Sequence, residues 1–182
     1  MACNLTQGRN EVCKDSIGGL SGVYFINYTT GSFATDANGY ITSFPSASTA
    51  YYYQLKGNSD YTETVTTSRD NGTTFFSQAV KMNVKKLTQD MSTQFKLLAY
   101  GRPQIVVVTN NGDSFLVGKT LGADVTAGTS QTGAALGDLY GYSITLTGME
   151  PVPANFITGS TSAANPFGSA TNQPTIVYGT NN

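Results

Sequence analysis

The sequence predicts a mostly β, single-domain protein: a β-barrel or sandwich with one packed helix and extended terminal arms. Charged residues make up only 12% of the 182 residues, about half of the usual share of roughly 25%. Threonine, serine, asparagine and glycine take their place, and these residues suit strands and turns better than helices. Apolar residues account for 39% of the chain, which is enough for one hydrophobic core. A surface so poor in charge favours burial against other subunits, because unpaired charges are costly to desolvate.

The first predicted strands are rich in aromatic and β-branched residues. Residues 22–28 and residues 50–56 have this composition, and the second stretch contains three consecutive tyrosines, Tyr51, Tyr52 and Tyr53. Between these stretches, Asn38-Gly39 is a strong signal for a tight turn.

A long hairpin is predicted over residues 61–85. Residues 61–69 alternate in type, Asp70-Asn71-Gly72 forms the turn, and residues 73–85 return. On the returning strand one face is mostly apolar, so it should point to the core. That face carries Phe76, Gln78, Val80, Met82 and Val84.

One helix is predicted over residues 88–100. Thr88 can cap it, and Asp90 lies in the first turn, where the helix dipole favours an acidic group. Met91, Phe95 and Leu98 form an apolar stripe that can pack on a sheet, and Gly101 and Pro103 end the helix. Packing explains this stripe better than a metal or cofactor role does.

The second half contains three more predicted strands. Residues 104–108 and 114–118 form a hairpin around Asn111-Gly112. Residues 122–137 are rich in glycine, threonine and alanine, and they predict a loop or a short crossing. Residues 140–147 alternate, with Tyr142, Ile144 and Leu146 on one face.

Three segments follow from these patterns. Residues 1–15 form an N-terminal segment, residues 16–157 a β-rich domain, and residues 158–182 an extended C-terminal arm. The arm is poor in apolar residues except Phe167 and the patch 176–178, so we expect a neighbouring molecule to order it.

Charge argues against tight nucleic-acid binding. The net charge is −1, and Lys85-Lys86 is the only adjacent basic pair, whereas phosphate binding needs clustered Lys and Arg. A near-neutral channel through which DNA slides passively is still compatible. No window of the sequence is apolar enough for a membrane span, and the first residues lack the order of a signal peptide. We therefore expect synthesis in a bacterial cytoplasm, with Cys3 and Cys13 as reduced thiols rather than a disulfide.

No catalytic, cofactor-binding or metal-binding residue is predicted. The chain has no histidine, which removes the commonest general base and a frequent zinc ligand. Four aspartates stand within two residues of a glycine or an asparagine, as turn carboxylates do: Asp36, Asp70, Asp113 and Asp138. Arg69 and Arg102 flank turns. They could bind an anion, but we expect them to pair with carboxylates of this chain or of its neighbour. Bases could stack on the tyrosines at 51–53, but without a basic groove sheet packing is the better interpretation, and an enzyme is not expected.

Several blocks of residues, scattered over residues 13–156, carry a resemblance to a known family. They are 13–20 with 23–25, 68–76, 97–103, 111–112, 132–133, 137–139, 141–142 and 150–156. Together they are moderately specific, and they resemble virion structural proteins of tailed bacteriophages, particularly phages of Bacteroidota hosts.

The resemblance implies a structural component of the particle, and its size and one helix are similar to tail tube subunits. Such subunits form stacked hexameric rings around a DNA channel. We expect the sheets to join laterally around a ring, and the 50–85 hairpin or the C-terminal arm to reach the next ring. The implied partners are further copies of the chain, other tail, neck or baseplate proteins, and passing DNA; the implied location is the virion tail, with no membrane contact.

Three alternatives stay open. The first is another virion position with the same fold: a neck, ring, terminator or baseplate protein. The second is a cell-encoded tube of a contractile injection machine. The third, from another class, is a carbohydrate-binding β-domain whose tyrosines stack on sugars.

Overall fold

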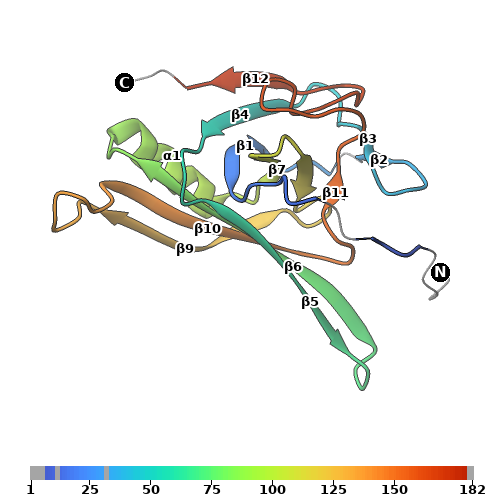
Figure 1. Ribbon diagram of the computed structural model, residues 1–182. Coiled ribbons are helices and arrows are strands. Elements are labelled where there is room, and N and C mark those ends of the chain that lie inside the picture. Colours follow the sequence, from blue (N-terminus) through green and yellow to red (C-terminus); the bar gives the residue numbers. More distant parts are fainter. Residues whose placement is uncertain (1–6, 11–12, 31–32, 180–182) are drawn as a thin grey trace.

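The computed structural model describes residues 7–10, 13–30 and 33–179, and it is a β-sandwich rather than a closed barrel (Figure 1). The predicted mostly β fold with one packed helix is confirmed. The single helix of the described residues is α1, Gln89–Tyr100. The strands are β1 Leu20–Ile26, β2 Ala34–Thr35, β3 Ile41–Ser43, β4 Thr49–Gln54, β5 Asp60–Ser68, β6 Thr73–Lys85, β7 Gln104–Thr109, β8 Ser114–Val117, β9 Ala123–Gln131, β10 Gly141–Glu150, β11 Asn155–Phe156 and β12 Thr175–Tyr178.

The larger sheet has six strands in the order β11-β8-β7-β1-β4-β12. All neighbours are antiparallel except β12, which runs parallel to β4. The central strand β7 is buried along both faces, as its continuous run of Ile and Val predicts. The turn between β7 and β8 uses Gly112, whose φ of 92° is the left-handed conformation that glycine adopts without strain.

The smaller sheet has four strands in the order β5-β6-β10-β9, antiparallel throughout. The predicted core faces are confirmed: Val80 and Met82 on β6, and Ile144 and Leu146 on β10, are fully buried. Figure 1 shows this sheet as the lower layer, with the other elements stacked on one side of it.

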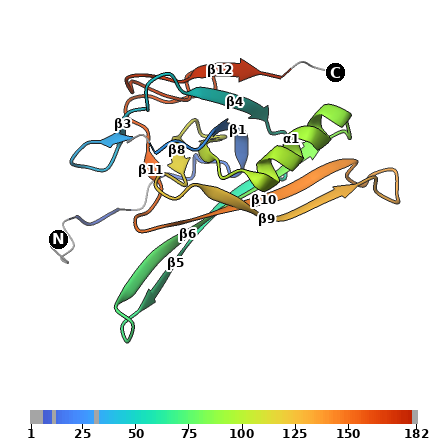
Figure 2. The same cartoon turned by 180° about the vertical axis from the view of Figure 1, so that it is seen from behind.

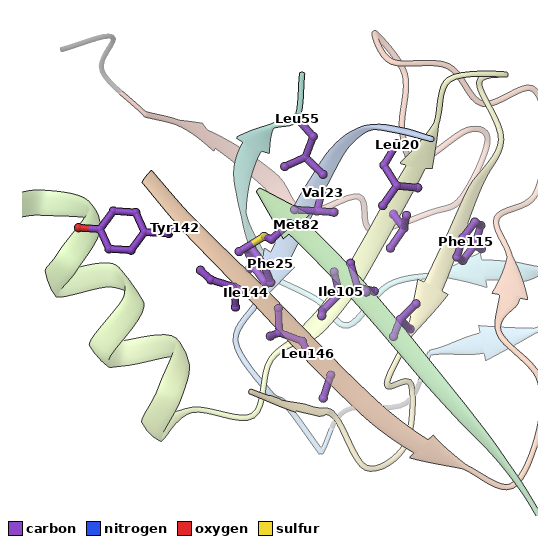
Figure 3. Close-up of a cluster of buried hydrophobic side chains, with 14 of the residues drawn as sticks. Leu20, Val23, Phe25, Leu55, Met82, Ile105, Phe115, Tyr142, Ile144 and Leu146 are labelled. Atoms are coloured by element: carbon purple, nitrogen blue, oxygen red, sulfur yellow. The ribbon is translucent and has the colours of Figure 1, made fainter. Parts of the chain in front are cut away.

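The main core lies between the two sheets. Met82, Ile144 and Leu146 face Val23, Phe25 and Ile105 of the larger sheet (Figure 3). A second apolar cluster covers the far face of the larger sheet, where Tyr24, Ile26 and Val106 point. The larger sheet is therefore covered on both faces.

The C-terminal segment corrects the expectation of an extended arm. Phe167 is only 2% exposed and lies in the second cluster, and Ala170 is buried beside it. Strand β12 then pairs with β4 from Thr175 to Tyr178. The few apolar residues of this segment suffice because the far face of the larger sheet needs a cover and the β4 edge offers hydrogen bonds. Residues 158–179 thus lie along the domain rather than reaching away from it.

Strand β9 corrects the expectation of a loop over residues 122–137. Residues Ala123–Gln131 pair with β10 along their whole length, with one bulge. These residues have a low strand propensity, but they form a strand because the unpaired edge of β10 offers backbone hydrogen bonds along its whole length. Gly128 also gives room to the helix: a Cβ there would lie 2.5 Å from the Phe95 ring.

Helix α1 packs as predicted. The Thr88 side chain accepts a hydrogen bond from the Met91 N–H at 3.2 Å, and the Gly101 N–H closes the last turn on the Leu97 carbonyl. Phe95 packs on Tyr142 of β10 with ring centroids 5.9 Å apart. The stripe of Met91, Phe95 and Leu98 therefore belongs to the main core.

Candidate assembly surfaces

The outer face of the four-stranded sheet carries mostly hydroxyl side chains. Residues that alternate with the buried ones point away from the core, and the strand registers place them together. They are exposed or half-buried. We call this surface the hydroxyl face; it comprises Thr62, Thr64, Thr66, Ser77, Thr126, Thr129, Ser143, Thr145 and Thr147.

The hydroxyl face is electrically balanced. Among its paired strand residues the charged groups are two lysines, Lys81 and Lys85, and two aspartates, Asp60 and Asp124. Asp60 lies directly opposite Lys81 in the strand register. A face with short hydroxyl groups and no net charge has little attraction for a phosphate backbone.

Both edges of the four-stranded sheet are long strands, β5 and β9, of nine residues each. The outer side of each edge strand has no partner strand within the described chain. Neither strand contains proline or lysine, the residues that commonly block pairing at a sheet edge. Because all four strands alternate in direction, β9 of one copy placed beside β5 of another continues the antiparallel pattern.

The β5–β6 hairpin projects beyond the sandwich (Figure 1). The neighbouring strand β10 ends at Glu150, opposite Phe76, so the distal part of the hairpin is a two-stranded ribbon. Val65, at the base of this ribbon, is 57% exposed. The turn is ordered by a hydrogen bond from the Gly72 N–H to the Arg69 carbonyl at 3.3 Å. An isolated ribbon of this kind is marginal in water and gains from a partner surface.

A groove lies between strand β4 and helix α1. It consists of two adjoining cavities of about 760 and 490 Å³, and both are lined by Tyr51, Tyr53 and Gln94. Tyr178 and Asp90 line the larger cavity. We call it the tyrosine-lined groove.

The two ends of the tyrosine-lined groove carry basic residues. Lys85 and Lys86 line the larger cavity. Arg102 lines the smaller one, where its guanidinium lies 4.3 Å from the ring centre of Tyr28. Arg102 thus contacts an aromatic ring where the sequence suggested a carboxylate partner.

The three tyrosines at 51–53 all line the groove, and two of them also pack on aromatic rings of the core. Tyr52 packs on Tyr24 at 4.8 Å between ring centroids, and Tyr53 packs on Phe25 at 5.1 Å. Tyr51 lies on the same face of β4 as Tyr53, opposite to Tyr52, and is 39% exposed. The predicted sheet packing is therefore confirmed for Tyr52 and Tyr53.

The sequence did not predict a buried network of polar side chains. Glu150 is 2% exposed, and its Oε1 accepts hydrogen bonds from the N–H groups of Thr120 and Leu121, both at 2.8 Å. Nearby, Gln78 accepts from the Gly118 N–H at 3.1 Å and donates to Glu63 at 3.3 Å. These contacts hold the turn that leads from β8 into the edge strand β9. The only sequence signal was a polar residue, Gln78, on an otherwise apolar strand face.

The same network perturbs a tyrosine. Burial raises the pKa of the Tyr61 phenol well above its usual value, and the neighbouring Glu63 carboxylate raises it further. Tyr61 is therefore a neutral packing group against Phe115, with ring centroids 4.5 Å apart.

The carboxylates singled out from the sequence lie in turns. Asp36 accepts hydrogen bonds from the N–H groups of Asn38 and Tyr40, both at 2.9 Å. Asp138 accepts from Ala134 and Ala135, and these bonds lower the pKa of its carboxyl group.

Nothing in the described part of the chain groups three or more Cys, Asp or Glu residues for a metal ion. Asp70 and Arg69 stand at the tip of the β5–β6 hairpin, and Asp113 follows the β7–β8 turn. Cys13 is exposed, and Cys3 lies outside the described residues.

Comparison with known proteins gives no match: no family model, no curated protein and no solved structure is similar to this chain. Within the described residues, no helix is long and apolar enough to cross a membrane.

Proposed function

We propose that the chain is a non-enzymatic structural subunit of a bacteriophage tail, which assembles into stacked, hexameric rings that form the tail tube. The observation that carries this proposal is the pair of long, unpaired edges of the four-stranded sheet. An exposed nine-residue edge without proline or lysine favours pairing with another chain.

The two edges suit a ring. A contact between β9 of one copy and β5 of the next uses two different surfaces, and such a contact forms a ring when its rotation closes. The antiparallel alternation of β5-β6-β10-β9 continues across such a contact without interruption. Ring closure would satisfy the outer backbone groups of both edge strands.

The hydroxyl face suits the inside of that ring. The rest of the sandwich lies on the side of the four-stranded sheet opposite to the hydroxyl face (Figure 2). In a ring with the rest of each sandwich on the outside, the hydroxyl face would therefore point toward the ring axis. Its balanced charge would let DNA pass without being held, because counterion release from clustered basic residues drives DNA binding. The resemblance to phage virion proteins supports the same location, the virion tail.

Microscopy of the purified chain tests the proposal. Negatively stained samples over a range of concentrations should contain rings or rods with a central channel, and light scattering should give the mass of a multiple of the chain. A chain that stays a monomer at the highest attainable concentration would refute the proposal. Copy number separates the tube from a neck, terminator or baseplate position, since a tube subunit is among the most abundant proteins of its particle.

One observation favours a second candidate, a carbohydrate-binding domain. The tyrosine-lined groove offers aromatic side chains and one carboxylate, Asp90, which are groups that bind sugars. A glycan array decides: binding that is lost in Tyr51→Ala supports this candidate, and absence of binding removes it.

A further inference from the structure

We infer that the tip of the β5–β6 hairpin of one copy binds in the tyrosine-lined groove of a copy in the next ring. The inference rests on the proposed function, because it names the contact that would join one ring to another. It assigns a partner to two features that lie on neither edge strand, the turn at the tip of the hairpin and the groove.

The hairpin tip is narrow and exposed, which suits binding in a cleft. It narrows to two strands where β10 ends, and its residues from Thr64 to Thr67 and from Arg69 to Thr74 are exposed. The Thr67 and Thr74 hydroxyls lie 3.0 Å apart across the ribbon. A ribbon held in this way loses less conformational entropy on binding than a free loop would.

The groove offers matching chemistry. Its tyrosines present flat, partly apolar surfaces, with Tyr51 39% and Tyr178 64% exposed. Tyrosines of this kind supply contact area at low entropic cost. Val65 at the base of the ribbon, at 57% exposure, is an apolar group that such a surface would cover.

Charges complement each other across the proposed contact. The tip carries Arg69 and Asp70 side by side. The larger cavity of the groove is lined by the acidic Asp90 and by two basic residues, Lys85 and Lys86. In the proposed contact Arg69 lies near Asp90, and Asp70 lies near the two lysines. This pairing of opposite charges favours one orientation of the tip in the groove.

The two features lie at opposite ends of the molecule. In Figure 1 the tip of the hairpin is at the bottom, whereas α1 and the end of β12 are at the upper left; Figure 2 shows the same separation from behind. A contact between different surfaces at opposite ends can repeat along one axis without closing, and it then adds copies without limit. This is the property that stacking of rings requires.

A charge swap tests the contact between Arg69 and Asp90. The variants R69E and D90R should each raise the protein concentration needed for rods about tenfold or more, while single rings still form. The double variant R69E/D90R should restore rod formation, because the opposite charges face each other again. The double variant also controls for any effect of D90R on the helix, since it carries the same substitution. Lys96→Glu, on the same helix but outside the groove lining, is the matched control and should leave rods unchanged.

Cross-linking tests the position of the tip directly. Chains carrying Cys3→Ser and Cys13→Ser receive either Asn71→Cys at the tip or Gln94→Cys in the groove, and the two are mixed before assembly. A short bismaleimide should join them into covalent dimers, whereas Asn71→Cys mixed with Lys96→Cys should give at most a trace.

The outcomes separate the two claims. Rods that form equally well in R69E and D90R, with no tip-to-groove cross-link, overturn this inference and leave the ring proposal standing. A wild-type chain that does not associate at all overturns both. Loss of rods in the single variants, recovery in the double variant and the specific cross-link together support the inference.

Discussion

The ring of Phe167 packs edge-on against the ring of Tyr24, with centroids 5.5 Å apart and planes at 61°. This contact joins the C-terminal segment to the first strand of the larger sheet, more than half the chain away. It makes residues 158–179 part of the folded domain, so their removal would expose the second apolar cluster as well as any assembly surface.

Removing the Phe167 ring should destabilise the domain. Phe167→Ala leaves a cavity against Tyr24 and Phe44, and should lower the free energy of unfolding by about 3 to 5 kcal/mol. Chemical denaturation measures this. Tyr178→Ala, at an exposed residue, is the control and should cost much less; equal effects would show that Phe167 does not anchor the segment.

Glu150 should determine the order of the turn before β9. Glu150→Ala removes the acceptor for the Thr120 and Leu121 N–H groups, and should cost about 1 to 3 kcal/mol of stability. Hydrogen exchange should show faster exchange of these two amides. Asp124→Ala, at an exposed side chain on the adjoining strand, should leave them protected. Unchanged protection in the Glu150 variant would contradict this account of the turn.

Stability should fall in alkaline solution. Burial raises the pKa of Tyr24 from 10.0 to about 12, and the neighbouring Tyr52 and Tyr178 add to the shift. The folded state therefore holds this proton more tightly than the unfolded state, so the contribution is complete below pH 10 and is lost as the pH rises from about 10 through about 12.

The Tyr24→Phe variant isolates that contribution. Its free energy of unfolding, measured between pH 9 and 12, should decline less steeply than that of the wild type. Part of the decline should persist, because burial also raises the pKa of Tyr61. Identical slopes for the two proteins would exclude Tyr24 as a source of the pH dependence.

Adding positive charge to the hydroxyl face should make assembled tubes retain DNA. Thr145 lies near the middle of that face, on β10, so Thr145→Lys would place one cation per copy toward the channel. Retention should weaken as salt increases, since it depends on counterion release. Ser92→Lys, on the exposed side of α1, adds the same charge elsewhere and should have no such effect. Equal retention by both variants would argue against the hydroxyl face lining the channel.

The sequence predicted the elements whose pattern is local. The β5–β6 hairpin, helix α1 and the β7–β8 hairpin each carry turn or cap residues and a clear periodicity, and all three form. The two corrections concern segments defined by distant partners. Strand β9 has a low intrinsic strand propensity and forms because it pairs with the edge of β10. Phe167 is buried because it packs on the apolar far face of the larger sheet.

The assembly surfaces were only partly predictable. The low charge and the hairpin pattern were visible in the sequence, and they led to the expectation of lateral joining. The hydroxyl face could not be identified as one surface, because it depends on the registers of four strands, including the β9 bulge. The groove between β4 and α1 depends on how the helix lies beside the larger sheet, which no periodicity encodes.

The most direct test is the order of strands around an assembled particle, determined by electron cryomicroscopy of the purified chain. The account predicts that β9 of each copy pairs with β5 of its neighbour and that the threonines of the hydroxyl face line the bore. Particles in which both of these edges face solvent, or a map of single molecules only, would contradict it.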